Sequence, residues 1–219
     1  MSDHPTAPVS KRMQALKLYS PSAARNRQAI CDVLEPRLPQ DARVLEIGSG
    51  TGEHAATLLE ARPDIFWQPT DPDPEYRSSQ TAWAQDFNGR MAQPLELDLC
   101  DPGWDNDLEG FDALVCINVI HISPITVLNA LAARAASIVK PDGLVFLYGP
   151  YKEGEKTAPS NLDFDRSLKS RNPQWGVRDL DLVIRTLGEG GFAALTRTDM
   201  PANNLSLIFQ PGVPSNASS

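Results

Sequence analysis

The fold is decided by residues 44–54, which read Val-Leu-Glu-Ile-Gly-Ser-Gly-Thr-Gly-Glu-His. An apolar run rich in branched residues passes directly into three glycines at alternate positions and then into a helical pattern. An ordinary turn between a strand and a helix needs only one glycine. Three of them indicate a tight turn whose main chain is left open to a ligand, at the end of the first strand. The predicted ligand-binding residues of this turn are Gly48, Ser49, Gly50, Thr51 and Gly52.

Strand and helix patterns alternate on both sides of this turn. Strands are predicted at 43–47, 65–70, 94–99, 113–118 and 144–149, and helices at 23–35, 54–61, 77–86, 125–139 and 179–188. Two last strands, 192–198 and 205–210, are joined by a segment too short for a helical crossover, which favours an antiparallel pair. The pattern predicts a doubly wound, Rossmann-like α/β fold with a seven-stranded, mostly parallel sheet and helices on both faces.

Composition limits the size and the partners of this domain. The chain has 219 residues, of which 41% are hydrophobic and 22% charged, which is typical of one globular domain. We expect that domain at 14–210, with flexible tails at 1–13 and 211–219. A net charge of −8 disfavours a nucleic-acid partner. The sequence has no long apolar run and begins without a signal-peptide pattern, so we expect a cytoplasmic protein without a membrane partner, as a monomer or homodimer.

The glycine spacing separates three classes of nucleotide site. A nicotinamide dinucleotide site favours a third glycine at position 53, which is Glu53, and the phosphate-binding P-loop needs a Gly-Lys-Ser/Thr that is absent. The spacing instead resembles motif I of class I methyltransferases that use S-adenosylmethionine (SAM). In that motif an acid on the strand precedes the glycines, and here the acid is Glu46. The resemblance therefore implies SAM as the cofactor.

Acidic residues also follow the next two predicted strands. Asp71 lies 19 positions beyond Gly52, where a carboxylate can accept hydrogen bonds from both hydroxyls of a ribose. By the resemblance, Asp98 faces the adenine amino group and Leu99 packs on the ring. Each acid alone is equally well a solvated loop carboxylate. Their placement after successive strands favours a shared cofactor site.

The end of the fourth predicted strand is where methyltransferases commonly place acceptor chemistry. Asn118 stands there as a further cofactor residue, and the Asn/Asp-Pro-Pro-Tyr of amide and amine N-methyltransferases is absent. His121 is the histidine placed to take a proton from an acceptor hydroxyl, and its alternative is a structural histidine bonded to the backbone. Tyr148, Tyr151 and Asp165 are further candidates for catalysis, as residues that orient the acceptor.

Further segments resemble a small, poorly characterised methyltransferase-like family of bacteria and animals. They begin at residues 20, 67, 120, 148, 160, 172 and 200, and include His-Ile-Ser-Pro, Tyr-Gly-Pro-Tyr, Trp-Gly-Val-Arg-Asp and Met-Pro-Ala-Asn-Asn. Buried polar side chains need partners, so these segments suggest a site. The resemblance implies that the substrate-binding residues are Asn161, Trp175, Arg178, Asn203 and Asn204. Tyr19, Arg25 and Asn26 would close over the cofactor, although Arg25 equally fits a surface ion pair.

These observations predict a SAM-dependent methyltransferase acting on a small-molecule acceptor at sulfur or oxygen. The alternative is a protein that binds SAM or S-adenosylhomocysteine as a sensor or regulator and performs no chemistry. The histidines His4, His54 and His121 show no metal-ligand spacing with one another or with the three cysteines, so no metal is expected.

Overall fold

The computed structural model describes residues 13–212. The expected tails therefore lie outside the described residues, except at Met13, Pro211 and Gly212. Pro211 ends the last strand, where it is paired with Phe192, and the Gly212 amide donates to the Gly191 carbonyl at 2.7 Å. The domain thus extends at least two residues beyond the boundary expected at 210.

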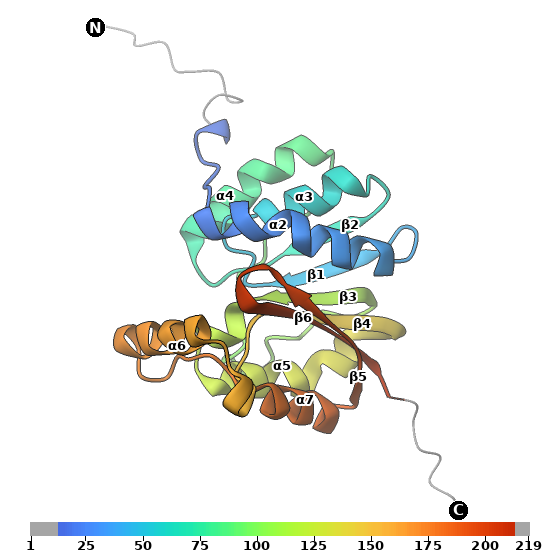
Figure 1. Ribbon diagram of the computed structural model, residues 1–219. Coiled ribbons are helices and arrows are strands. Elements are labelled where there is room, and N and C mark those ends of the chain that lie inside the picture. The colour runs from blue at the N-terminus through green and yellow to red at the C-terminus, as the bar shows by residue number, and fades with distance from the viewer. Residues whose placement is uncertain (1–12, 213–219) are drawn as a thin grey trace, which may run out of the picture.

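A single mixed sheet of six strands forms the centre of the molecule (Figure 1), in the order β2-β1-β3-β4-β6-β5. β2, β1, β3 and β4 are parallel, whereas β6 runs antiparallel to both β4 and β5. The strands are β1 (Arg43–Ile47), β2 (Phe66–Pro69), β3 (Phe111–Ile117), β4 (Val139–Pro150), β5 (Phe192–Met200) and β6 (Asn204–Pro211). This topology confirms the predicted Rossmann-like sheet and its antiparallel C-terminal pair.

The strand expected at 94–99 is reduced to isolated bridges beside β2. Met91 pairs with Trp67 and Leu95 pairs with Thr70, both in parallel. Pro69 and Pro94 have no amide hydrogen to donate, so a continuous ladder cannot form between these two segments. The segment nevertheless occupies the seventh position of the sheet.

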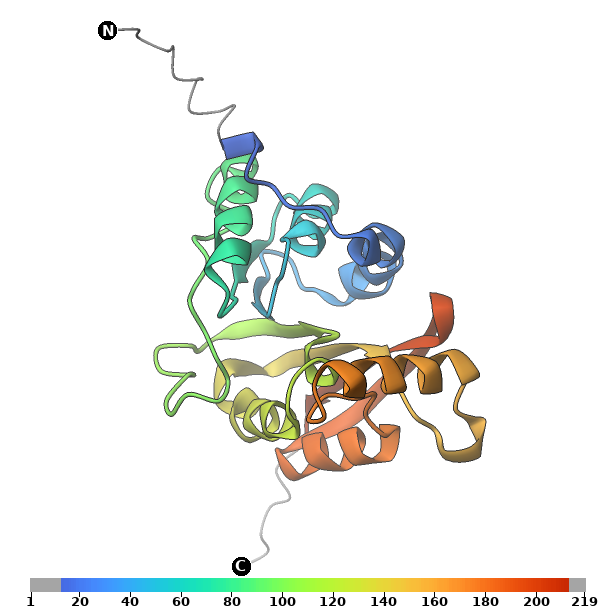
Figure 2. The same cartoon turned by 90° about the vertical axis from the view of Figure 1, so that its left-hand side faces the viewer.

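Helices cover both faces of the sheet, which lies between the two layers in Figure 2. α2 (Pro21–Leu34), α3 (Glu53–Ala61) and α4 (Pro74–Ala84) form one layer; α5 (Ile125–Ile138) and α7 (Leu180–Glu189) belong to the other. Each face of the sheet has its own hydrophobic core, and β1 contributes to both. Val44 packs with residues of α2 and α3, whereas Leu45 and Ile47 pack with residues of α5 and α7. Short 3-10 helices lie at Glu35–Arg37, Gln85–Phe87, Val119–His121, Gly154–Lys156 and Pro201–Asn203.

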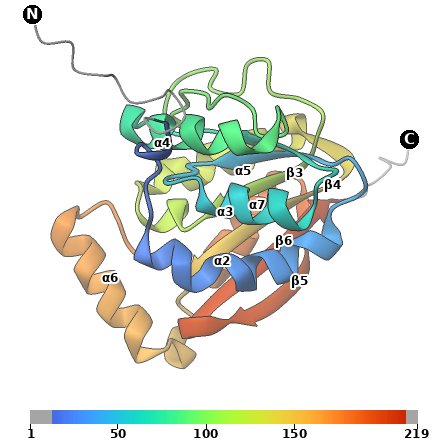
Figure 3. The ribbon, with the colours of Figure 1, turned by 90° about the horizontal axis from the view of Figure 1, so that it is seen from above.

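One helix, α6 (Pro159–Arg171), was not predicted. Only three of its residues are buried, and two of them, Asn161 and Asp165, are polar. A helix with so few apolar contacts has no clear amphipathic pattern. In Figure 3 it stands apart from α5 and α7 at the side of the body, and its first residues lie near the turn between β5 and β6.

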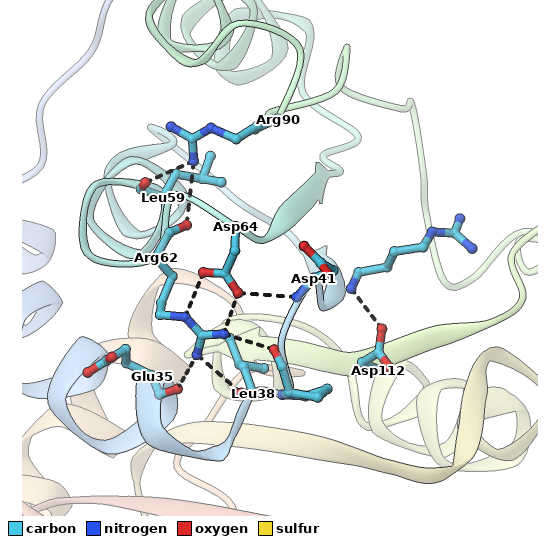
Figure 4. A network of polar contacts seen from close by, with 10 residues as sticks. Glu35, Leu38, Asp41, Leu59, Arg62, Asp64, Arg90 and Asp112 are labelled. Carbon is cyan, nitrogen blue, oxygen red and sulfur yellow. Dashed lines mark hydrogen bonds and ion pairs between the residues drawn. The ribbon is translucent and has the colours of Figure 1, made fainter.

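Arg62, the residue that follows α3, makes a network of hydrogen bonds between α3 and the segment before β1 (Figure 4). Its guanidinium donates to both carboxylate oxygens of Asp64, at 2.8 and 2.6 Å. It also donates to the carbonyls of Glu35, Leu38 and Pro39 at 2.9 to 3.1 Å. One side chain thus joins the end of α3 to the segment that follows α2.

We expect Arg62→Lys to lower the free energy of unfolding by about 1 to 2 kcal/mol, because an ammonium cannot reach all five oxygens. Urea unfolding followed by circular dichroism measures this change. Arg166→Lys is the matched control, since its ion pair with Asp163 is exposed and a surface pair contributes less than about 1 kcal/mol. Equal losses in the two variants would contradict the assignment.

Candidate functional site

Three alternate glycines follow β1 with left-handed backbone. Gly48, Gly50 and Gly52 have φ values of +63°, +52° and +88°. A Cβ on Gly48 would lie 2.6 Å from Val119 Cγ2, whereas no heavy atom lies within 4 Å of one on Gly50. The first glycine is therefore required by packing. The second leaves open space beside its Cα, which a side chain would otherwise enter.

The turn is held by the neighbouring strand and by α4. The Gly50 amide donates to Asp71 Oδ2 at 2.9 Å, and the Ser49 amide donates to the Thr70 carbonyl at 2.8 Å. From α4, the Gln80 side-chain amide donates to the Gly50 carbonyl at 2.8 Å. The main chain of the turn is thus fixed before any ligand binds.

Glu53, which occupies the position of the third glycine in dinucleotide folds, has a structural role. Its Oε2 accepts from the Ser20 amide at 2.6 Å and from Thr51 Oγ1 at 3.0 Å, and its Oε1 pairs with Arg27 at 3.4 Å. This buried carboxylate fastens the segment before α2 to the glycine turn.

A cavity of about 570 Å³ opens at the carboxyl edge of β1, β2 and β3. Ten of the predicted residues line it: Glu46, Gly48, Ser49, Gly50, Thr51, Asp71, Asp98, Leu99, Asn118 and Trp175. The sequence analysis missed the contribution of Ser20, Ser22, His54, Tyr76 and Ile122. His54 could have been predicted to line the cavity, because it lies in the first turn of the helix that follows the glycines.

The carboxylates differ strongly in their surroundings. Glu46 is buried, and burial raises its pKa to about 7 although Ser49 and Trp67 hydrogen-bond to it; its Oε2 accepts from Trp67 Nε1 at 3.0 Å. Burial also raises the pKa of Asp71, whose Oδ1 accepts from the Asp73 amide at 3.0 Å. Asp98 is exposed and accepts from the Cys100 amide at 2.9 Å. All three face one cavity from successive segments of the sheet edge.

His54, Asn26 and Tyr148 form a polar group beside the cavity. His54 Nε2 is 2.9 Å from Asn26 Oδ1, an acceptor, so the proton lies on Nε2. The Asn26 side chain also hydrogen-bonds to Tyr148, whose pKa is raised by burial despite that bond. Burial and the charge of Arg27 lower the pKa of His54 to about 4, so the imidazole is neutral at pH 7. Asn26 and Tyr148 therefore support a lining residue and are not themselves part of the lining.

His121, which was expected to act on an acceptor, lies behind the cavity wall and not in its lining. Its side chain is fully buried and does not line the cavity. Its Nδ1 accepts from the Arg178 amide at 3.2 Å, and its ring packs edge-on against Tyr151, with centroids 5.1 Å apart. Burial and the charge of Arg178 lower its pKa to about 3. The structural alternative, a histidine bonded to the backbone, describes this residue.

Arg178 holds the segment that follows β3. Its guanidinium donates to the carbonyls of Ile120, Ser123 and Gln174 at 2.7, 2.5 and 3.3 Å. Arg178 does not line the cavity, whereas Trp175 on the same loop does. Arg178 is thus a positioning residue for the wall, in place of the substrate contact expected of it.

The other predicted substrate residues join α6 to the end of the sheet. The Asn161 side-chain amide donates to the carbonyls of Tyr151 and Asn203, at 3.1 and 3.0 Å. Asn203 in turn donates to Ser160 Oγ at 2.9 Å, and Asn204 donates to the Pro201 carbonyl at 2.9 Å. None of these side chains lines the cavity, because their polar atoms are used to hold the main chain.

The remaining predicted residues, among them Gly52 of the glycine turn, also lie outside the cavity lining. Asp165 Oδ2 pairs with Lys152 and Lys169, both at 2.8 Å; burial opposes ionisation, but these two partners hold the pKa of Asp165 below its ordinary value. The Tyr151 side chain is fully buried, and burial raises its pKa. Tyr19 packs against Trp83 with ring centroids 5.6 Å apart, and Arg25 is exposed. Neither of the last two closes over the cavity in this conformation.

A family model described as a protein of unknown function, DUF938, matches residues 17–211. The chain belongs to this family. In a comparison with curated proteins, this DUF938 protein is 32% identical over 111 residues to a highly reducing polyketide synthase of Aspergillus aculeatus. That match covers 48% of the chain and 4% of the synthase.

Solved structures share the fold of the DUF938 protein. An O-methyltransferase family protein from Burkholderia thailandensis has a TM-score of 0.74 at 18% identity, covering 95% of this chain and 62% of that one. Human N-acetylserotonin methyltransferase in complex with SAM has a TM-score of 0.71 at 17% identity, covering 93% and 56%. The chain spans less than two thirds of the length of each of these two structures. The TM-scores show that it has the Rossmann-like fold of SAM-dependent methyltransferases.

Within residues 13–212, no helix combines the length and the apolar character needed to cross a bilayer. In that same part of the chain, no group of three or more histidine, cysteine or acidic side chains is arranged to hold a metal ion.

We expect Arg178→Lys to lower the free energy of unfolding of the DUF938 protein by about 1 to 3 kcal/mol, since an ammonium cannot span the three carbonyls. Thermal unfolding measures the loss, and hydrogen exchange at the His121 and Ile122 amides reports whether the wall segment loosens. Arg185→Lys, on the exposed face of α7, is the control. Unchanged exchange at both amides would contradict the positioning role.

We expect Glu46→Gln to raise the free energy of unfolding at pH 8 by about 3 kcal/mol relative to wild type, with little gain at pH 5. The pKa of Glu46 is raised to about 7 in the folded state. The contribution of Glu46 to the stability of the wild-type protein is therefore complete below about pH 4.5, where Glu46 is protonated in both states. This contribution to the free energy of unfolding falls as the pH rises from there through 7. Urea unfolding at both pH values tests this, with exposed Glu60→Gln as control. A gain independent of pH would contradict it.

Proposed function

We propose that the DUF938 protein is a SAM-dependent methyltransferase that acts at sulfur or oxygen of a small molecule. The observation that carries the proposal is the convergence of the open Gly50 backbone and the strand-end acids on one cavity. The fold shared with SAM-dependent methyltransferases supports it. We retain a cytoplasmic location, and a monomer or homodimer, as expectations.

The residues of the cavity fit the parts of SAM. Each Asp71 oxygen accepts one backbone amide, which leaves further lone pairs for two ribose hydroxyls. Asp98 would take the adenine amino group and Leu99 would pack on the ring. Glu46, buried at the end of β1, would pair with the amino group of the methionine moiety. A cation there favours the ionised carboxylate and compensates its burial.

When bound, SAM supplies a methyl group that is already activated, so this chain mainly has to align the acceptor and exclude water. The wall after β3 provides that alignment, with Val119 and Ile122 on the cavity side and Arg178 behind. His121 is not in contact with the cavity, which favours an acceptor that needs little help to lose its proton. A thiol, with an ordinary pKa near about 8.5, meets that condition better than an alcohol.

The absence of His121 from the cavity lining is also compatible with a protein that binds SAM or S-adenosylhomocysteine without performing chemistry. Turnover separates the two functions. Methyl transfer from SAM to any small thiol or phenol excludes the binding-only alternative.

We expect S-adenosylhomocysteine to bind with micromolar affinity, and Asp71→Ala to weaken binding at least tenfold through lost hydrogen bonds to a charged group. Isothermal titration calorimetry measures both affinities. Asp73→Ala is the matched control, because Asp73 caps α4 in the same loop, is exposed and does not line the cavity.

Circular dichroism establishes that both variants are folded. Failure of folded wild-type protein to bind S-adenosylhomocysteine would overturn the proposed function. An Asp71→Ala affinity equal to that of the control would overturn the role of Asp71.

A further inference from the structure

The lining of the cavity carries acidic groups without basic ones. Glu46, Asp71 and Asp98 line it, and among residues 13–212 no lysine or arginine does. The one imidazole in the lining, His54, is held as the neutral form by its bond to Asn26 and by burial. An acceptor that adds an anionic group to this cavity meets no cation of the described chain to replace its water. SAM also carries a carboxylate, but its ammonium and sulfonium groups give the whole molecule a net positive charge.

Three arginines near the cavity are engaged elsewhere. Arg27 pairs with the buried carboxylate of Glu53, and the Arg178 guanidinium is occupied by three carbonyls. Arg171 lies against the ring of Trp175, 5.7 Å from its centroid, but does not itself line the cavity. Turning any of these three side chains into the cavity would therefore break an existing contact.

Part of the cavity lining is apolar. Val119, Ile122, Pro124 and Val127 line it from the segment after β3 and the start of α5, and Trp175 lines it from the loop after α6. Ile122 is 42% exposed, and Trp175 is half-buried. Large apolar side chains that face a cavity gain free energy when an apolar ligand removes them from water.

We propose that the acceptor is an uncharged, flat, apolar molecule, such as a phenol or a thiol carried on an arylalkyl group, bound against Trp175 and Ile122. Acceptors that carry a carboxylate or a phosphate are rejected by the three carboxylates and by the lack of a basic partner. Trp175 and Ile122 are the specificity-determining residues. This inference rests on the proposed methyltransferase function, because it assigns the apolar part of the cavity lining, around Trp175 and Ile122, to the acceptor.

The test compares 2-naphthol with 2-naphthoate, which share one ring system and differ in charge at pH 7.5. Both are titrated into the full chain, with and without saturating S-adenosylhomocysteine, by isothermal titration calorimetry. We expect 2-naphthol to bind at least tenfold more tightly than 2-naphthoate. Equal affinities, tighter binding of 2-naphthoate, or no measurable binding of 2-naphthol under either condition would overturn the proposal.

Substitutions then test whether Trp175 and Ile122 determine the preference for 2-naphthol over 2-naphthoate. Trp175→Ala should weaken 2-naphthol binding at least tenfold, whereas Trp175→Phe should keep it within threefold of wild type. Ile122→Arg should reduce the preference for 2-naphthol at least tenfold by giving the carboxylate a partner. Leu162→Arg, an equally exposed leucine on α6 outside the lining, should leave the preference unchanged.

If Trp175→Ala and Ile122→Arg behave like Leu162→Arg, these residues do not determine specificity. The order of naphthol and naphthoate affinities tests the acceptor class, whereas S-adenosylhomocysteine binding tests the proposed function. The two can therefore fail separately.

Discussion

Positive φ at three alternate residues after β1 is the constraint from which the rest of the site follows. It turns the main chain so that the Gly50 amide meets the Asp71 carboxylate, which fixes the ends of β1 and β2 relative to each other. It also begins α3 at Glu53, whose carboxylate reaches the Ser20 amide. Side chains at these positions would strain the turn, so the cavity depends on the absence of three Cβ atoms.

The same turn explains why the part of the cavity around it could be predicted from the sequence. In a parallel sheet the carboxyl ends of neighbouring strands meet at one edge, so residues at strand ends converge whatever the remainder of the chain does. Glu46, Asp71 and Asp98 all line the cavity for this reason. Regular structure was predicted less well where proline interrupts hydrogen bonding, at 94–99, and where a helix buries few apolar residues, as α6 does.

The sequence does not show which interior polar residues line the cavity, and the reason is chemical. A polar side chain in the interior needs a partner, and the sequence does not tell whether that partner is a ligand or the main chain. For Asn161 and Arg178 the partners are carbonyl groups of distant segments, and for His121 the partner is a backbone amide. These residues build the wall on which a ligand can rest. Trp175 does line the cavity, on a loop that Arg178 holds through the Gln174 carbonyl, a contact that only the folded chain shows.

The way in which Arg178 holds the wall has a consequence for how the protein can evolve. The carbonyl oxygens that it binds are present in every amino acid, so the anchoring does not depend on which side chains the segment carries. Val119 and Ile122 can therefore be exchanged while the backbone that presents them keeps its place. New side chains can be presented to the cavity on a fixed frame, and single substitutions are sufficient to change its lining.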